Sequence, residues 1–472
     1  MNDTICALAT APGGALGIIR ISGPQSLEIL SHVFRGSGDA LTYPANTIHY
    51  GHIVEYDAVS QHPLPLDEVI LSIFRAPHSY TGEDSVEISC HGSRYILNKV
   101  LELLIANGCR MANPGEYTQR AYLNGKMDLS QAEAVADLIA STNKATHQIA
   151  MSQLRGGIST ELSRLREQLL KLTSLLELEL DFSDHEDLEF ADRSELLNLA
   201  KTIDNHITHL AHSFESGQAI KKGIPVAIVG KTNVGKSTLL NALLKDDRAI
   251  VSDIHGTTRD TIEDTMDIQG VTFCFIDTAG IRQTTDEVEQ IGINRTFAAI
   301  DKARIILWLI DAEPTPEEVQ DMQERCKDKS LIIIFNKIDL PSSKSTDKLF
   351  SHLLPLTPHL LSISAKFGTN LSDLESAIYQ AANIPTLQES DIIITNARHY
   401  DALIRAHAHL QRVLEGLGEA DSPLSALNSQ LPPDLVAEDL RQTLDTLAEI
   451  TGSQITPNEV LGNIFKNFCV GK

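Results

Sequence analysis

The sequence predicts a multidomain protein: an α+β N-terminal domain, then a discontinuous all-α helical domain into which an α/β domain of the P-loop type is inserted. Three patterns predict this organisation. Short β-rich runs between Gly and Pro turns occupy residues 1–120. Apolar residues at helical spacing dominate residues 121–220, and the helical pattern returns over 381–472. Between them, residues 221–380 alternate apolar strands with helical segments, as expected for a parallel sheet.

Each domain contains recognisable elements. In the first, Gly17–Ile21 and Val86–Cys90 are expected as strands and Ser93–Ala106 as a helix. The inserted domain has apolar runs that each end at a polar or Gly-rich motif: Val226–Val229, Phe273–Ile276, Ile305–Ile310 and Leu331–Phe335. Because an open α/β sheet binds ligands beyond the carboxyl ends of its strands, these motifs mark the expected site. The acidic run 181–187 is expected as a loop, and Thr456–Glu459 carries capping signals for the last helix.

Composition excludes several classes of protein. The net charge is −24, and residues 121–220 and 381–472 together carry 14 Lys and Arg against 28 Asp and Glu. This is not the basic surface of a protein that grips nucleic acid by itself. The N-terminus lacks the pattern of a signal peptide, and no long uninterrupted apolar run suggests a membrane span. The six scattered cysteines show no CxxC spacing and suit reduced thiols, so we expect a cytoplasmic protein.

A phosphate-binding loop is the strongest motif. Residues 230–237 read Gly-Lys-Thr-Asn-Val-Gly-Lys-Ser, directly after an apolar strand and before an amphipathic helix. Backbone N–H groups of such a loop turn toward phosphate, Lys236 reaches the β- and γ-phosphates, and the Ser237 hydroxyl holds Mg²⁺. The predicted nucleotide contacts here are Asn233, Val234, Gly235, Lys236, Ser237 and Thr238.

Companion motifs predict that the nucleotide is GTP. Asp277-Thr278-Ala279-Gly280 follows a strand and is expected beside the metal and the γ-phosphate. Asn336, Lys337 and Asp339 follow another strand, and Ser364, Ala365 and Lys366 form a second loop on the base side. The carboxylate of Asp339 can accept both N–H groups of guanine, which adenine does not offer, so an ATP-dependent machine is disfavoured.

The predicted switch loop 250–260 contributes Ser252, Thr257 and Thr258, with Thr258 completing Mg²⁺ coordination. Gly280 is followed by Ile281, which cannot orient a water as the glutamine of Ras does. Asn233 and carbonyls of the loop are therefore candidate ligands of a monovalent cation. Glu289 is the carboxylate in the second predicted switch that could position the attacking water. The alternatives are that Asn233 caps a turn and that Glu289 is one charge in an acidic stretch.

Motifs along the whole chain resemble the MnmE (TrmE) family of tRNA-modification GTPases. They are Gly17–Gly23, Thr81–Glu87, Asn113–Thr118, Leu123–Leu129, Gln131–Leu138, the P-loop with its asparagine, Gly256–Asp260 and the terminal Phe468–Lys472. The resemblance implies K⁺-dependent GTP hydrolysis driven by dimerisation of the nucleotide domains. It places K⁺ on Asn233, Ser252, Ile254 and Thr257 and Mg²⁺ on Ser237 and Thr258. It also implies that Glu289 is the general base or positions the water.

The same resemblance implies a folate site in the N-terminal domain, which forms a homodimer. A one-carbon tetrahydrofolate, in its 5,10-methylene or 5-formyl form, would contact Arg20, Glu87, Lys126 and Lys472. Arg20 and the lysines suit the carboxylates of folate, and Glu87 suits a pterin N–H edge. Taken alone, Glu87 also fits an ordinary solvent-facing strand residue, and Lys126 fits an ordinary turn lysine.

The implied reaction modifies C5 of the wobble uridine of certain tRNAs, forming 5-carboxymethylaminomethyl or aminomethyl uridine. The family works with a flavoprotein partner, MnmG, as a heterotetramer, and FAD would belong to that partner. Cys469 is either a small buried hydrophobe or a reactive catalytic thiolate in the terminal tail. The alternative function is a regulatory RNA- or ribosome-binding GTPase switch without modification chemistry, which leaves the tail and the folate positions without a role.

Overall fold

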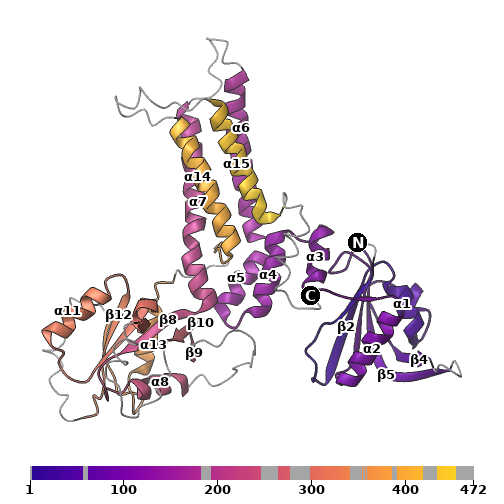
Figure 1. The fold of residues 1–472 in the computed structure, drawn as a ribbon, viewed down its shortest axis with the longest axis horizontal. Coiled ribbons are helices and arrows are strands. Elements are labelled where there is room, and N and C mark those ends of the chain that lie inside the picture. The colour runs from indigo at the N-terminus through magenta and orange to yellow at the C-terminus, as the bar shows by residue number, and fades with distance from the viewer. Residues whose placement is uncertain are drawn as a thin grey trace. The chain divides into compact units, whose positions relative to one another are not determined.

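The computed structural model describes residues 3–56, 62–181, 193–245, 264–276, 298–340, 353, 357, 359–384, 391–417 and 433–452. The chain divides into two compact units (Figure 1). The first comprises Met1–Ala140, Ala150–Ile207 and Asp401–Lys472, and the second comprises Ser141–Ile149 and Thr208–Tyr400. Predictions for the acidic loop after residue 181, for the switch loop and for the last helix lie outside the described residues.

The first unit contains a seven-stranded sheet in the order β3-β4-β5-β6-β2-β1-β7. Neighbouring strands are antiparallel except β1 and β7, which are parallel. The strands are β1 (Ile5–Leu8), β2 (Leu16–Ser22), β3 (Phe34–Gly36), β4 (Thr47–Tyr56), β5 (Pro63–Phe74), β6 (Ser85–His91) and β7 (Arg110–Met111). The predicted strands in Gly17–Ile21 and Val86–Cys90 are confirmed as parts of β2 and β6.

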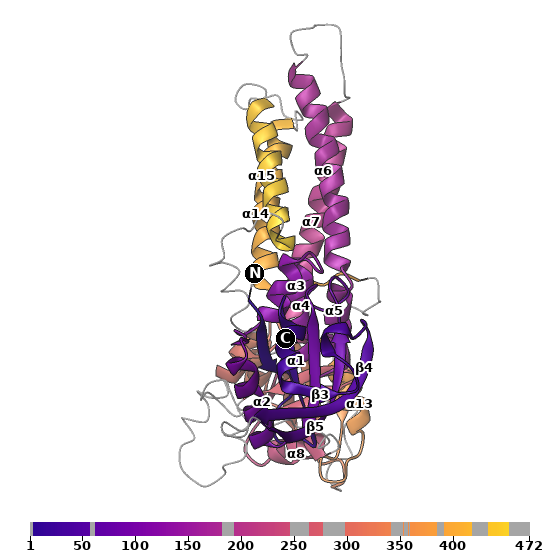
Figure 2. The same ribbon diagram turned by 90° about the vertical axis from the view of Figure 1, so that its right-hand side faces the viewer.

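Two helices, α1 (Ser26–Val33) and α2 (Arg94–Ala106), lie against one face of this sheet (Figure 2). Strand residues such as Ile19, Leu71 and Ile88 alternate inward and form one apolar core with Leu30 and Val100 of the helices. The predicted helix over 93–106 is confirmed as α2. A short 3₁₀ turn, η1 (Ala40–Thr42), follows β3.

Helical segments complete the first unit. They are α3 (Glu116–Leu123), α4 (Leu129–Ala140), α6 (Gly157–Asp181) and α15 (Pro433–Thr451), with parts of α5 (Lys144–Leu154), α7 (Arg193–Lys222) and α14 (Ala397–Leu417). Helix α6 packs along α15. Polar pairs join the other helices: Asp204 of α7 contacts His407 of α14, and Arg405 of α14 pairs with Glu449 of α15. Among the described residues, no helix has the length and apolar character needed to cross a membrane.

The second unit contains a six-stranded sheet in the order β13-β12-β11-β8-β10-β9. Its strands are β8 (Ile224–Val229), β9 (Asp264–Ile268), β10 (Val271–Phe275), β11 (Ile305–Ile310), β12 (Ser330–Phe335) and β13 (His359–Ser362). All neighbours are parallel except β9, which is antiparallel to β10. The predicted parallel sheet is therefore confirmed.

Apolar cores lie on both faces of this sheet, with α8 (Lys236–Lys245) and α13 (Leu371–Ala381) contributing to one and α11 (Pro316–Arg325) to the other (Figure 1). The central strand β8 has β10 on one side and β11 on the other, so the chain crosses over β8 between them. In open α/β sheets, ligands bind beyond the carboxyl ends of the strands at such a switch point. The loop after β8 is the predicted phosphate-binding loop.

Residues 141–149 pack with the nucleotide-type sheet, although their helical pattern predicted a place in the helical domain. Ala145 and Ile149 belong to one of its apolar cores. The Ala145 N–H donates to the Gly270 carbonyl at 3.0 Å, and the Asn143 amide donates to Thr272 at 2.7 Å. The division into three domains, 1–120, 121–220 with 381–472, and 221–380, stays a prediction.

Candidate functional site

The P-loop, residues 230–237, connects β8 to α8 and needs glycine at two positions. Gly230 has φ +153°, and a Cβ there would lie 2.3 Å from the Leu309 carbonyl oxygen. Gly235 has φ +102°, and a Cβ there would lie 2.4 Å from the Asn336 amide nitrogen. Any side chain at either position would push the loop away from β11 or from the Asn336 side chain.

Lys236 begins α8 and is turned back over the loop. Its Nζ donates to the carbonyls of Gly230 and Lys231, at 2.6 Å each. Burial lowers the pKa of Lys236, because removal from water disfavours the ammonium. Its contact with phosphate stays a prediction of the motif. Ser237 follows in the first turn, half-buried, and its hydroxyl suits a hard cation such as Mg²⁺.

The buried Asn336 side chain joins three loops. Its amide donates to the Val234 carbonyl at 2.8 Å, and its oxygen accepts from the Ala365 N–H at 3.0 Å. Val234 belongs to the P-loop, Asn336 follows β12, and Ala365 follows β13. One side chain therefore fixes the phosphate loop against both predicted base-side loops.

A second hydrogen bond, at Asp339, connects the two base-side loops. The Ser364 hydroxyl donates to Asp339 Oδ1 at 2.7 Å, which holds an exposed carboxylate at the end of the β12 loop. Lys337, in the left-handed conformation at φ +64°, pairs with Asp311 at 2.7 Å. Sequence reasoning missed Asp311, although its place directly after β11 was a usable signal. Lys366 lies over the ring of its neighbour Phe367, with its Nζ 5.3 Å from the ring centroid.

Asn233 is exposed and has φ +62°, a conformation that asparagine adopts more readily than most residues. An exposed asparagine of the P-loop can offer its amide oxygen to a cation, and that role stays a prediction. The other predicted residues of this site lie outside the described residues: Ser252, Ile254, Thr257, Thr258, Asp277, Thr278, Ala279, Gly280 and Glu289. Their roles stay predictions.

A second group of predicted residues lies on the face of the seven-stranded sheet away from α1 and α2. Arg20 of β2 and Glu87 of β6 are register partners, and two guanidinium nitrogens of Arg20 donate to Glu87 Oε1 at 2.9 and 2.7 Å. The rings of Tyr80 and Tyr117 flank Arg20, with centroids 5.8 and 5.6 Å from its Cζ. Sequence reasoning assigned neither tyrosine a role at this site. Arg20 is thus already paired with Glu87. A ligand carboxylate must therefore bind Arg20 together with Glu87 or replace Glu87 as its partner.

Lys126 joins this group through the loop 77–82. Its Nζ donates to the Pro77 carbonyl at 2.9 Å, and its stem lies about where a side chain on Gly82 would point. Tyr80, in the same loop, contacts Arg20. A carboxylate, two cations and two aromatic rings suit a flat ligand that has carboxylate groups and N–H edges. The remaining predicted residues of the N-terminal site and tail, Lys472 and Cys469, lie outside the described residues.

The parallel sheet and the loops around Asn336 define the class of P-loop GTPases. Family models described as the MnmE helical domain and as the N-terminus of the GTP-binding protein TrmE match residues 129–469 and 4–126. Curated proteins named tRNA modification GTPase MnmE are similar over the whole of this chain. Those of Phocaeicola vulgatus and Bacteroides thetaiotaomicron are 55% and 52% identical, over 99% and 100% of their lengths. The chain belongs to the MnmE family.

One solved structure, a GTP-binding protein of Sulfolobus solfataricus, is also similar to part of this chain. It covers 47% of this chain and 67% of its own, at 21% identity and a TM-score of 0.25. This similarity is too low to carry an argument about function.

Proposed function

We propose that this member of the MnmE family, a GTP hydrolase of tRNA modification, is activated by K⁺ and acts on C5 of the wobble uridine. With the flavoprotein MnmG, which supplies FAD, it forms 5-carboxymethylaminomethyl or aminomethyl uridine in certain tRNAs. A one-carbon tetrahydrofolate supplies the carbon. The observation that carries the nucleotide part is the Asn336 side chain, which bonds both Val234 and Ala365.

The P-loop and the two base-side loops would each contact a different part of bound GTP. Lys236 exchanges its two carbonyl partners for phosphate oxygens, and Ser237 would hold Mg²⁺, which neutralises phosphate charge. Asp339 accepts the two guanine N–H groups while Ser364 keeps its carboxylate oriented. Since Asn336 couples these loops, correct seating of the base also aligns the phosphate loop.

K⁺ is proposed because the second switch carries Ile281 where a water-orienting glutamine would stand. Another positive charge must then stabilise the charge that develops on the phosphates. Asn233 is exposed at the P-loop tip and offers an uncharged oxygen ligand, which suits K⁺. Ser252, Ile254 and Thr257 would complete the cage, Thr258 would join Ser237 at Mg²⁺, and Glu289 would position the water. These assignments follow the family resemblance.

The folate proposal is supported by the grouping of Arg20, Glu87, Lys126 and the two tyrosines on one sheet face. Lys472 would add a further cation. Cys469 is proposed as a reactive thiolate in the modification step. The net charge of −24 would repel the phosphates of tRNA, which supports a complex in which MnmG makes most of the contacts with tRNA.

A homodimer through the N-terminal domain is supported by exposed apolar side chains on the same sheet face. Ile48 is 72%, Tyr50 59% and Ile70 47% exposed. Tyr50 and Ile70 are register partners on β4 and β5, so their side chains are neighbours. Adjacent large apolar residues on an open sheet face indicate a protein interface.

Mass spectrometry of tRNA nucleosides tests the proposed function. Cells that lack this protein should lose the C5-modified wobble uridines, and the wild-type gene should restore them. Lys236→Ala should fail to restore them, because the protein would no longer bind the GTP phosphates. Arg20→Ala should also fail while retaining GTP hydrolysis, which separates folate chemistry from the nucleotide site. Unchanged wobble uridines in the deletion strain would favour the regulatory GTPase switch instead.

A further inference from the structure

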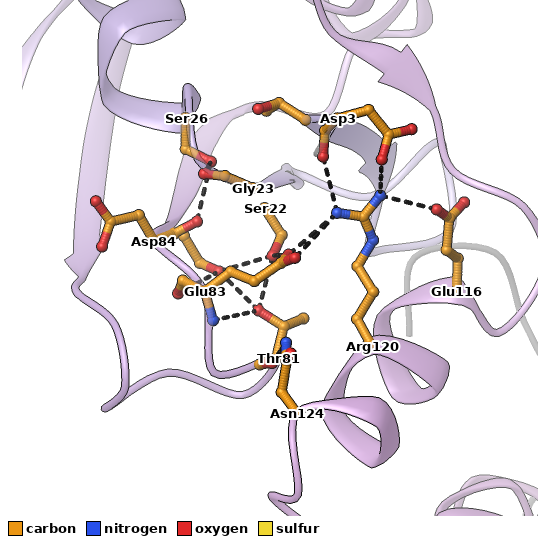
Figure 3. A network of polar contacts seen from close by, with 12 residues as sticks. Asp3, Ser22, Gly23, Ser26, Thr81, Glu83, Asp84, Glu116, Arg120 and Asn124 are labelled. Carbon is orange, nitrogen blue, oxygen red and sulfur yellow. Dashed lines mark hydrogen bonds and ion pairs between the residues drawn. The ribbon is translucent and has the colours of Figure 1, made fainter. Parts of the chain in front are cut away.

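A buried arginine of the N-terminal domain holds three carboxylates together (Figure 3). Arg120 of α3 is 1% exposed. Its guanidinium donates to Asp3 at 2.8 Å, to Glu116 at 2.9 Å and to both oxygens of Glu83 at 3.2 Å. The three acids come from the first residues of the chain, from α3 itself and from the loop before β6. Such a fully buried charge keeps its place only through these partners.

Glu83 extends the network into the loop that precedes β6. The Ser22 hydroxyl donates to Glu83 Oε2 at 2.8 Å and lies 2.7 Å from the Thr81 hydroxyl. The Glu83 N–H donates to the Thr81 hydroxyl at 3.3 Å, and Ser85 bonds Ser22 at 3.1 Å. Residues 81–83 are therefore fastened to the end of β2 and to Arg120 by side-chain bonds on their buried side.

The outer side of the same loop supports the proposed ligand contacts. The Asn124 amide donates to the Thr81 carbonyl at 2.7 Å, and Lys126 donates to the Pro77 carbonyl at 2.9 Å. Gly82 has φ +78°, and a Cβ there would lie 3.2 Å from the Asn124 side chain and 3.4 Å from the stem of Lys126. Tyr80, which lies between Pro77 and Gly82 in sequence, has its ring centroid 5.8 Å from Arg20 Cζ. The loop thus carries one wall of the site and the support for Lys126.

We propose that the Arg120–Glu83 pair is a positioning device for the folate site, fixing the loop 77–83 so that Tyr80 and Lys126 face the ligand. This inference rests on the proposed folate function. Arg120 and Glu83 touch no ligand themselves. They act by holding a loop that contains a left-handed glycine, Gly82, and whose neighbour Asp84 accepts from the Ala76 N–H at 2.8 Å. The Tyr80 hydroxyl is also held directly, 2.8 Å from the Thr118 hydroxyl of α3, so the Arg120–Glu83 pair adds the anchor at the 81–83 end of the loop.

The chain offers a matched control for the test, because Asp3 is also a ligand of Arg120 but makes no side-chain bond to the loop among the described residues. In Glu83→Gln, the amide nitrogen cannot accept from Arg120 or Ser22. In Asp3→Asn, Arg120 likewise loses a charged partner, but the loop keeps Glu83. Both variants should lower the thermal unfolding temperature. Only Glu83→Gln should weaken binding of 5-formyltetrahydrofolate, by about tenfold or more, in titration calorimetry of the full chain.

A second pair of variants tests the hydroxyl of Thr81 by itself. Thr81→Val loses the bonds to Ser22 and to the Glu83 N–H, and it should weaken folate binding. Thr81→Ser keeps the hydroxyl and should bind folate as the wild-type chain does. Equal folate affinity in Glu83→Gln and Asp3→Asn, or Thr81→Ser binding as weakly as Thr81→Val, would overturn the positioning role. If the wild-type chain binds no folate while it still hydrolyses GTP, the proposed folate function itself fails.

Discussion

The Ser364 hydroxyl donates to the Asp339 carboxylate at 2.7 Å, so two loops that follow different strands meet at the carboxylate proposed to recognise guanine. Asp339→Asn should lower GTP affinity by about a hundredfold, because an amide cannot accept both guanine N–H groups. The same variant should gain affinity for xanthosine triphosphate, whose O2 accepts from the new amide. Displacement of a fluorescent nucleotide measures both. Ser364→Ala, which loses only the orienting bond, should cost less; an unchanged preference in Asp339→Asn would remove Asp339 from base recognition.

Asn233→Ala should abolish the advantage of K⁺ over Na⁺ in GTP hydrolysis. The wild-type rate should be about tenfold or more higher in K⁺, since a bound cation stabilises charge in the transition state. Without the Asn233 oxygen the cage loses a ligand, and the two salts should give similar slow rates. Steady-state phosphate release in matched KCl and NaCl checks this. Wild-type rates that do not differ between the salts would remove the proposed cage.

Glu289→Ala should retain GTP affinity within about twofold and lower turnover by about 10²-fold or more, because a positioned carboxylate acts only on the attacking water. Glu289→Asp is the informative companion, since it keeps the charge on a shorter side chain and should recover part of the rate. Single-turnover hydrolysis separates this chemical step from product release. Full activity in Glu289→Ala would favour the alternative, in which Glu289 is one charge in an acidic stretch.

Glu116→Gln should flatten the acid dependence of stability in the N-terminal domain. Burial alone would raise the pKa of Glu116, but hydrogen bonds from Arg110, Asn113 and Arg120 outweigh it and hold the pKa below its ordinary 4.5. A lowered carboxyl pKa contributes stability that is present above about pH 4.5 and is lost as the pH falls through the folded-state value. Wild-type unfolding temperatures should therefore fall steeply below pH 4.5.

Calorimetric unfolding of both proteins from pH 7 to pH 3 measures this effect. The variant should be less stable at pH 7 and should lose less between pH 4.5 and pH 3. Parallel curves would show that Glu116 does not carry the acid dependence.

Ile70→Asp should shift the chain from dimer toward monomer, because the proposed dimer interface would bury an unpaired charge on this apolar sheet face. Tyr95→Asp is the control: Tyr95 is 69% exposed on α2, which covers the opposite face. Sedimentation velocity distinguishes the two states. A dimer that survives Ile70→Asp but not Tyr95→Asp would place the interface on the helical side.

Much of the nucleotide site was predictable because its motifs are contiguous in sequence. Residues 230–237 carry the P-loop signature, and each apolar run before a motif became a strand of the parallel sheet. Glycine turns and apolar strands can be predicted from neighbouring residues alone, because these patterns do not depend on distant parts of the chain. The predicted helix after the P-loop is confirmed as α8, which begins at Lys236 within the motif itself.

Contacts between distant segments were not predictable in this way. Arg120 meets Asp3 across 117 residues, and no local pattern marks either as a partner of the other. Tyr80 reads as an ordinary turn residue until the loop folds over Arg20. Residues 141–149 have a helical pattern that fits either unit, and only packing assigns them to the second.

The sequence by itself determined the class of protein and the order in which strands and motifs alternate, and it predicted which residues meet phosphate and guanine. These depend on chemical type at fixed spacing, which a chain displays without folding. The tertiary structure decided that Asn336 couples three loops, that Arg20 is paired with Glu87 and that Arg120 fastens the loop beside it. Hydrogen bonds and ion pairs depend on distances of a few ångströms, which only the folded chain fixes.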